Sequence, residues 1–252
     1  MVEPSMLQEY LLRLGDNGLI LAQRLAEWSG KAPALEEDMA LANVALDLLG
    51  QARLWLAYAA EIEGPDASED TLAYLRDAPA FRNLLLVEQA NGNYAETMAR
   101  QFYFDVWHKL LLSGLARSHD ERIAGIAAKA VKEVAYHGER SAGWVIRLGA
   151  GTALSHQRMQ AAIDDLWPYT GEMFTADALD QALIAAGIAC DPAALHAPWL
   201  EKVGATLDAA GLTLPAAKWM QSGGKQGRHS ERLGYILAEM QFLPRAYPGA
   251  AW

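Results

Sequence analysis

The sequence predicts an all-α fold. Apolar residues recur every three to four positions through long segments, which is the spacing of one face of a helix. Clusters of proline and glycine separate these segments, and the alternating apolar and polar pattern of strands is almost absent. Of the 252 residues, 52% are hydrophobic and 21% are charged, so the chain can bury a sizeable core.

The positions of the proline and glycine clusters predict where each helix begins and ends. Four long helices are expected, and their ranges are Ser5–Trp28, Leu35–Glu63, Phe81–Leu115 and Asp120–Gly149. A fifth helix should begin near Ser155 and kink or end at Pro168, because proline removes a backbone donor and clashes with the preceding turn. Shorter helices are expected at Asp177–Ala186, at Ala194–Ala209 and in ERLGYILAEMQFL, which follows the loop-like stretch SGGKQGRHS.

A single domain is expected over residues 1–252. Residues 1–150 would supply the core bundle helices, and residues 151–252 would add further helices and a C-terminal extension. Helices of about 30 residues are each about 45 Å long, given the helical rise per residue. One architecture that uses such lengths is the ferritin-like bundle, whose helices hold carboxylates and histidines facing a central axis. We therefore expect a long, ferritin-like four-helix bundle with additional C-terminal helices.

The charge and cysteine content exclude several classes of protein. Lysine and arginine number 21 against 31 aspartate and glutamate residues, a net charge of −10, and the pI is near 5.1. An acidic surface attracts neither nucleic acid nor anionic membranes, so we expect neither as a partner. The lone cysteine, Cys190, cannot form an internal disulfide. With no secretory signal and no apolar run of about 20 residues, a soluble cytoplasmic protein is expected.

Two of the long helices match a metal-binding template in spacing but not in residue type. A di-iron carboxylate bundle takes one Glu from each of two helices and a Glu-x-x-His pair from each of the other two. In DLLGQ the paired positions hold Leu48 and Gln51, and in KEVAYHGE they hold Val134 and His137. A glutamine on an otherwise apolar helix stripe needs a reason, and the remnant of a metal site is one.

Five stretches together resemble one protein family, and the resemblance covers essentially the whole chain. They are LRLGDNGLILAQRLAEW, LANVALDLLGQAR, RNLLLVEQANGN, KAVKEVAYH and GGKQGRHSERLG. The chain resembles the ferritin-like subunits of bacterial phenylacetyl-CoA epoxidase, and specifically the non-catalytic C subunits. In the catalytic partner subunit, the resemblance implies Glu at the equivalents of Leu48 and Val134, and His at those of Gln51 and His137. Three of these four ligands are then lost, so the resemblance implies no catalytic residue and no bound metal in this chain.

The three losses make physical sense as a set. Bundle carboxylates without a metal are buried like charges that cost several kcal/mol each. Leucine and valine instead add apolar burial, about 1.5–3 kcal/mol per side chain. Asp105 is the expected single carboxylate of the third helix, and its pairing with Gln51 or His137 in a polar plug is a hypothesis. A lone His137 cannot hold iron, and a hydrogen-bonded core histidine is the simpler interpretation.

The resemblance also implies a function. The family's complex epoxidises the aromatic ring of phenylacetyl-CoA with dioxygen and with electrons from NADPH, which pass through a separate reductase that carries flavin and iron–sulfur groups. The di-iron centre would belong to the homologous catalytic subunit, and this chain would hold no cofactor. It would pack against that subunit as a pseudo-symmetric heterodimer, beside the other small subunit of the complex.

Two segments are candidates for contact with the coenzyme A part of the substrate. The residues carried over are Ala80, Phe81, Arg82, Asn83, Gln181, Ala182 and Leu183. Arg76, Arg82 and Asn83 combine cations with a planar amide at an expected helix N-terminus, which favours anions. The alternative interpretation is that these residues only cap a helix and carry surface charges, with no contact to a ligand. The stretch GGKQGRHS lacks the spacing of a nucleotide-binding loop, and a mobile connector that positions the last helix or docks a partner is favoured.

Two other functions stay open at the level of sequence. The first is an active di-iron oxygenase with atypical ligands, for which Asp105, His137 and Gln51 are the only donors that can be named. The second is a helical module that binds acyl-CoA or another protein outside any oxygenase. Iron content of the isolated chain and co-purification with a di-iron homologue would discriminate among the three functions.

Overall fold

The computed structural model describes residues 3–250, and within that range the chain is helical with no strand. The predicted all-α class is confirmed. The contacts between backbone positions divide the chain into two compact units, which are described in turn. The first comprises residues 3–90 and 223–250, and the second residues 91–222. The single domain expected over residues 1–252 stays a prediction.

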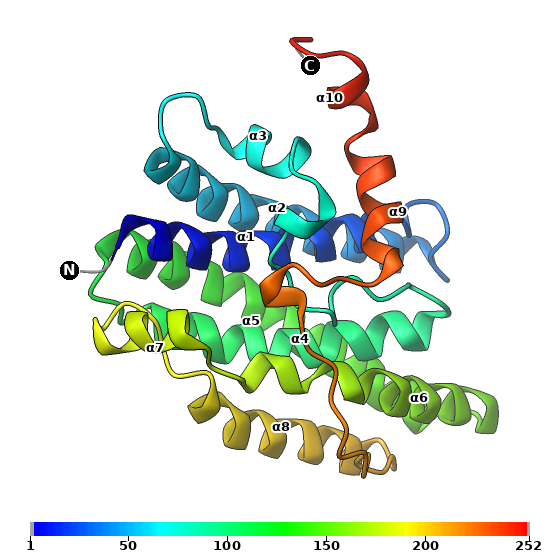
Figure 1. Ribbon diagram of the computed structural model, residues 1–252. Coiled ribbons are helices and arrows are strands. Elements are labelled where there is room, and N and C mark those ends of the chain that lie inside the picture. Colours follow the sequence, from blue (N-terminus) through cyan, green and yellow to red (C-terminus); the bar gives the residue numbers. More distant parts are fainter. Residues whose placement is uncertain (1–2, 251–252) are drawn as a thin grey trace. The chain divides into compact units, whose positions relative to one another are not determined.

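In the first unit, α1 (Pro4–Ala26) packs along α2 (Leu35–Glu63), and the short connection makes the pair antiparallel (Figure 1). The ends of α2 agree with the prediction. The backbones approach closely at Gly18, where an added Cβ would lie 3.0 Å from the carbonyl oxygen of Leu48. The smaller elements of this unit are α3 (Glu69–Tyr74), a 3-10 turn (Ala78–Ala80), a second such turn (Gly224–Gln226), α9 (Glu231–Met240) and α10 (Phe242–Ala246).

The helix α2 is apolar on two faces. One face is buried and includes Leu48 and Trp55. On the opposite face four large apolar side chains are exposed, and they are Leu35 (74%), Met39 (60%), Leu46 (65%) and Leu49 (41%). Their spacing places them on one line of the helix, about 20 Å long. We call these four residues the α2 stripe.

The second unit is built on α4 (Tyr94–Leu115) and α5 (Glu121–Gly149), which pack against each other and against α6 (Ala153–Leu166). As predicted, α6 ends just before Pro168. Two further helices are α7 (Ala178–Ala185) and α8 (His196–Ala209). A buried aromatic cluster joins α4 to α8, since the rings of Tyr103 and Trp199 lie 5.6 Å apart and Trp199 donates to the Tyr103 carbonyl oxygen.

The predicted start of the third long helix was wrong. The helix was expected from Phe81, but α4 begins at Tyr94 and residues 81–93 are not helical. A capping box fixes this start, because the Asn93 side chain accepts from the backbone of α4 while Glu96 accepts from the Asn93 N–H. The residues before Asn93 are therefore a separate segment with its own partners.

Within residues 3–250, no helix has both the length and the apolar character that crossing a membrane requires.

Candidate functional site

The template positions of α2 lie in the first unit. Leu48 is fully buried and Gln51 is 4% exposed, so both side chains point into the protein, as their shared stripe predicts. Gln51 is the polar member of a buried face that otherwise holds leucine, valine, alanine and tryptophan. No acidic side chain stands at the position that the Glu-x-x-His spacing assigns to a metal ligand in this helix.

The second unit holds the other template positions and a carboxylate. The Asp105 cluster consists of Gln101 and Asp105 from α4 with His137 and Ser141 from α5, all buried. Gln101 Nε2 donates to Asp105 Oδ1 at 2.6 Å, and Ser141 Oγ donates to Oδ2 at 2.8 Å. Val134 lies one turn before His137 and is fully buried. The two helices thus surround one carboxylate with neutral donors.

Burial dominates the electrostatics of this cluster. Desolvation raises the pKa of Asp105 from its ordinary 3.8 to about 6, although the charge of His137 and the hydrogen bonds from Ser141 and Gln101 act to lower it. Nearby, burial and the charge of His137 lower the pKa of His108 to about 3. His108 is therefore neutral at physiological pH, and Asp105 exchanges its proton near pH 6.

The hydrogen-bond partners of Asp105 differ from those that the sequence suggested. Asp105 lies close enough to His137 for their charges to interact, whereas its hydrogen-bond partners are Gln101 and Ser141. Neither Ser141 nor Gln101 was predicted from the sequence as a partner of Asp105. The spacing of Gln101 and Asp105, four positions apart on one helix, was the available signal. The role of Leu48, Gln51, Asp105, Val134 and His137 as a degenerate metal site stays a prediction.

The residues present do not fit a di-iron centre. Within the described range, no group of three or more His, Cys, Asp or Glu side chains is arranged to hold a metal ion. A dinuclear centre of this class draws on four carboxylates and two histidines. Leu48 and Val134 offer no donor atom, and the Asp105 cluster has one carboxylate. No chemical step through a metal follows from this donor set.

A second polar network holds the non-helical segment of residues 81–90 inside the first unit. Glu88 is fully buried, and its carboxylate accepts from His229 Nδ1 at 2.8 Å, the Ser230 N–H at 2.7 Å and Asn83 Nδ2 at 3.1 Å. Arg24 of α1 donates to the Glu88 carbonyl oxygen. We call Asn83, Glu88, His229 and the Ser230 N–H the Glu88 network. It supplies a buried loop with the partners that a helix would have supplied internally.

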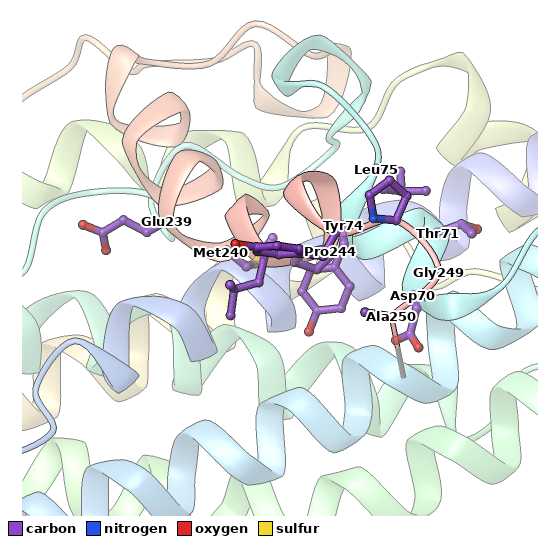
Figure 2. Close-up of a pocket in the computed structure, with 12 residues that line it drawn as sticks. Asp70, Thr71, Tyr74, Leu75, Glu239, Met240, Pro244, Gly249 and Ala250 are labelled. Carbon is purple, nitrogen blue, oxygen red and sulfur yellow. The ribbon is translucent and has the colours of Figure 1, made fainter. Parts of the chain in front are cut away.

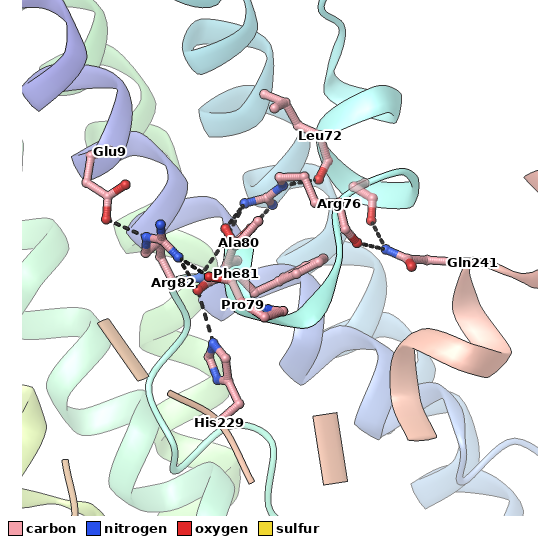
Figure 3. A network of polar contacts seen from close by, with 11 residues as sticks. Glu9, Leu72, Arg76, Pro79, Ala80, Phe81, Arg82, His229 and Gln241 are labelled. Atoms are coloured by element: carbon pink, nitrogen blue, oxygen red, sulfur yellow. Dashed lines mark hydrogen bonds and ion pairs between the residues drawn. The ribbon is translucent and has the colours of Figure 1, made fainter. Parts of the chain in front are cut away.

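The arginines expected to bind an anion are already paired. Arg76 pairs with the buried carboxylate of Asp16 and lies over the Phe81 ring, 4.3 Å from its centroid. Arg82 Nε donates to Glu9 Oε1 at 2.6 Å (Figure 3). The helix N-terminus invoked for these residues does not exist, because this segment is not helical. Their charges are thus largely neutralised by acids of α1.

The other candidates for coenzyme A contact differ in accessibility. Phe81 and Asn83 are fully buried, as is Leu183. Gln181 is exposed, and the half-buried candidates are Ala80, Arg82 and Ala182. Contact with a ligand at these segments would therefore fall mainly to Arg82 and Gln181, and it stays a prediction.

The glycine-rich stretch positions the last helices through fixed contacts. An added Cβ at Gly224 would lie 2.2 Å from the Asn83 carbonyl oxygen, so this position requires glycine. His229 Nε2 lies 3.0 Å from the Phe81 carbonyl oxygen (Figure 3), and Ser230 directly precedes α9. The stretch connects to α9, as the sequence favoured, and contacts the 81–90 segment at Gly224, His229 and Ser230. The mobility expected of this connector stays a prediction.

Together these features define the class of protein: a helical, ferritin-like protein whose long helices bury apolar side chains, among them Leu48 and Val134. A family model for phenylacetic acid catabolic proteins matches residues 2–252. The chain belongs to that family. It is also 54% identical over 248 residues to the C subunit of the 1,2-phenylacetyl-CoA epoxidase of Escherichia coli (strain K12), covering 98% of this chain and 100% of that relative.

Proposed function

We propose that this chain is a structural, non-catalytic subunit of a phenylacetyl-CoA 1,2-epoxidase. It pairs with a homologous di-iron subunit that epoxidises the substrate, while a separate reductase delivers electrons from NADPH. Membership in such a complex is supported by the 54% identity to the C subunit of the Escherichia coli enzyme, which extends over the full length of that relative.

The observation that carries the non-catalytic role is the burial of Leu48 and Val134. Both side chains are fully buried at the template's acidic positions, and neither has an atom that can ligate iron. Gln51 replaces a histidine with a neutral amide. The remaining carboxylate, Asp105, receives two hydrogen bonds from neutral side chains, which is the environment of a structural polar group. The alternative of an active oxygenase with atypical ligands lacks enough donors.

The pairing with a partner subunit is supported by the α2 stripe. Exposed leucines and a methionine in a line along one helix are unusual on a monomer surface and are typical of helix-mediated interfaces. A homologous subunit is the expected occupant, because a related helix would present a face of similar length and character. We assign the α2 stripe to this interface.

The complex would hold its substrate mainly in the catalytic subunit. In this proposal the polar contacts of the coenzyme A tail with the present chain are made by Arg82 or Gln181, the accessible polar members of the two candidate segments. Because Arg82 is paired with Glu9, its contribution to binding would be small.

Co-expression with the homologous di-iron subunit tests the proposal. We expect the two chains to purify together, with iron and epoxidation activity present in the complex. We expect the present chain alone to contain only traces of iron by elemental mass spectrometry and to be inactive. Gln51→Leu should leave the activity of the complex unchanged, because the amide has no chemical role.

Two results would contradict the proposal in different ways. A stoichiometric di-iron centre with turnover in the isolated chain would make it an active oxygenase. Failure to associate with any di-iron homologue would instead favour a helical module that binds acyl-CoA or another protein.

A further inference from the structure

A groove lies between α3 and the C-terminal segment of the first unit. Its volume is about 600 Å³, which is within the range of pockets that hold drug-sized ligands. Figure 2 shows Asp70 and Glu239 at opposite ends of the lining, with Tyr74, Met240 and Pro244 between them. The groove therefore has an acidic residue at each end and an apolar middle.

The two walls of the groove are fixed to each other by hydrogen bonds. Gln241 Nε2 donates to the carbonyl oxygens of Ala73 and Arg76, at 3.1 and 2.9 Å. Arg245 of α10 donates to the carbonyl oxygens of Leu75 and Arg76, which lie just beyond the end of α3. The bond to Ala73 satisfies one of the last carbonyls of α3, and all four bonds hold the C-terminal helices beside α3. The groove is thus a built feature of this unit.

The residues that line the groove favour a ligand that carries positive charge next to apolar groups. No lysine, arginine or histidine lines the groove among the described residues, and Arg245 is paired with Asp77 at 2.9 Å. Tyr74 and Asp70 both line the groove, so an aromatic ring and a carboxylate are available to a cationic ligand. Leu243, 48% exposed, adds apolar surface that the described chain leaves uncovered.

We propose that this groove binds an extended peptide segment of a partner protein in which lysine or arginine residues flank apolar ones. The carboxylates of Asp70 and Glu239 attract the two cationic ends, and Tyr74, Met240 and Leu243 contact the apolar centre. Because the chain carries a net charge of −10, a basic segment is also favoured by long-range attraction. The proposal is independent of the reaction that the complex performs.

An array of fluorescein-labelled heptapeptides tests this assignment with the full-length chain. One set carries Lys or Arg on both sides of Leu, Pro, Val or Tyr, and a matched set carries Glu at the same positions. In fluorescence anisotropy titrations we expect binding by members of the basic set only. The double variant Asp70→Asn/Glu239→Gln should weaken that binding by about tenfold, the effect of two partly screened ion pairs. Leu243→Ser should also weaken it.

The control is Glu201→Gln/Asp208→Asn on α8, which removes the same charge from exposed positions of the second unit. It should bind the basic peptides as the wild type does. Because Asp70 lies in the first turn of α3, circular dichroism should verify folding, and Glu239→Gln alone provides a second variant on the exposed face of α9. Absence of binding by every basic peptide, or equal weakening by the control pair, would overturn the proposal.

Discussion

Asp105 is a fully buried carboxylate whose two oxygens accept from an amide and a hydroxyl. The charges of His137 and Arg140 and the hydrogen bonds from Ser141 and Gln101 favour the ionised form, but together they do not offset its loss of water. Here the carboxylate persists beside the buried Val134 and His137, and its ionisation carries a cost in stability.

We predict that Asp105→Asn stabilises the isolated chain above pH 6. The folded-state pKa of about 6 is higher than the ordinary 3.8, so the folded protein binds the proton more tightly than the unfolded chain. The stability therefore falls as pH rises from about 3.8 to about 6, by about 2–3 kcal/mol at most, and stays at the lower level above pH 6. The introduced amide can donate to Gln101 Oε1, an atom without a hydrogen-bond partner among the described residues.

Denaturant titrations at pH 4 and pH 8 measure this effect. The variant should exceed the wild type in free energy of unfolding at pH 8, and the difference should shrink toward zero at pH 4. Asp208→Asn, at an exposed position, should show no such trend. A variant less stable than the wild type at pH 8 would mean that the carboxylate is required for the packing of α4 against α5.

At the scale of elements, the connector before α9 depends on a single histidine. His229 lies between the Glu88 carboxylate and the Phe81 carbonyl oxygen, both of which accept hydrogen bonds, so the doubly protonated ring fits both contacts. Desolvation acts to lower the pKa of His229, but the bonds to Glu88 and Phe81 and the charges of Glu88 and Asp16 outweigh it, and the pKa is raised.

We predict that His229→Gln loosens α9 most strongly at low pH. A raised folded-state pKa means that the stabilisation is fully present below the unfolded value near 6.5 and is lost as pH rises through the folded value. The variant should lose about 2 kcal/mol at pH 6, the order of a charge-assisted hydrogen bond, and less at pH 9. Hydrogen exchange of the α9 amides at both pH values measures this. Equal loss at both would show that protonation is not involved.

The long helices could be predicted from sequence because their evidence is local. The ends of α2 and the end of α6 before Pro168 follow from proline, glycine and apolar spacing within a few residues. The segment of residues 81–90 could not be predicted in this way, because its apolar residues are compatible with a helix. The hydrogen bonds that hold this segment in a non-helical conformation come from residues distant in the sequence. For example, the Asn17 side chain accepts from the Leu84 N–H. The Asn93–Glu96 capping box was a local signal that was missed.

The same distinction applies to the candidate site. The inward positions of Leu48, Val134 and His137 follow from helical periodicity, and each is buried. Ser141 and Asp105 are 36 positions apart in the sequence, and Glu88 and His229 are 141 positions apart. Pairings at such separations depend on tertiary packing, which a single sequence does not specify.

At the scale of the whole molecule, composition and surface together indicate a protein that works in a complex. The chain carries a net charge of −10, and the α2 stripe exposes large apolar side chains. A free monomer gains nothing from such a stripe. A subunit gains affinity from it, since burial of central apolar residues dominates many interfaces.

We predict that Leu46→Glu/Leu49→Glu prevents assembly with the homologous di-iron subunit without unfolding the chain. Both side chains are exposed, so the free energy of unfolding should change by less than about 1 kcal/mol. Two charges in an apolar interface should raise the dissociation constant by about 100-fold or more, as measured by analytical ultracentrifugation. Leu154→Glu/Leu214→Glu introduces the same charges at exposed leucines of the second unit and should assemble normally. If both double variants assembled equally well, the partner would have to bind a face other than the α2 stripe.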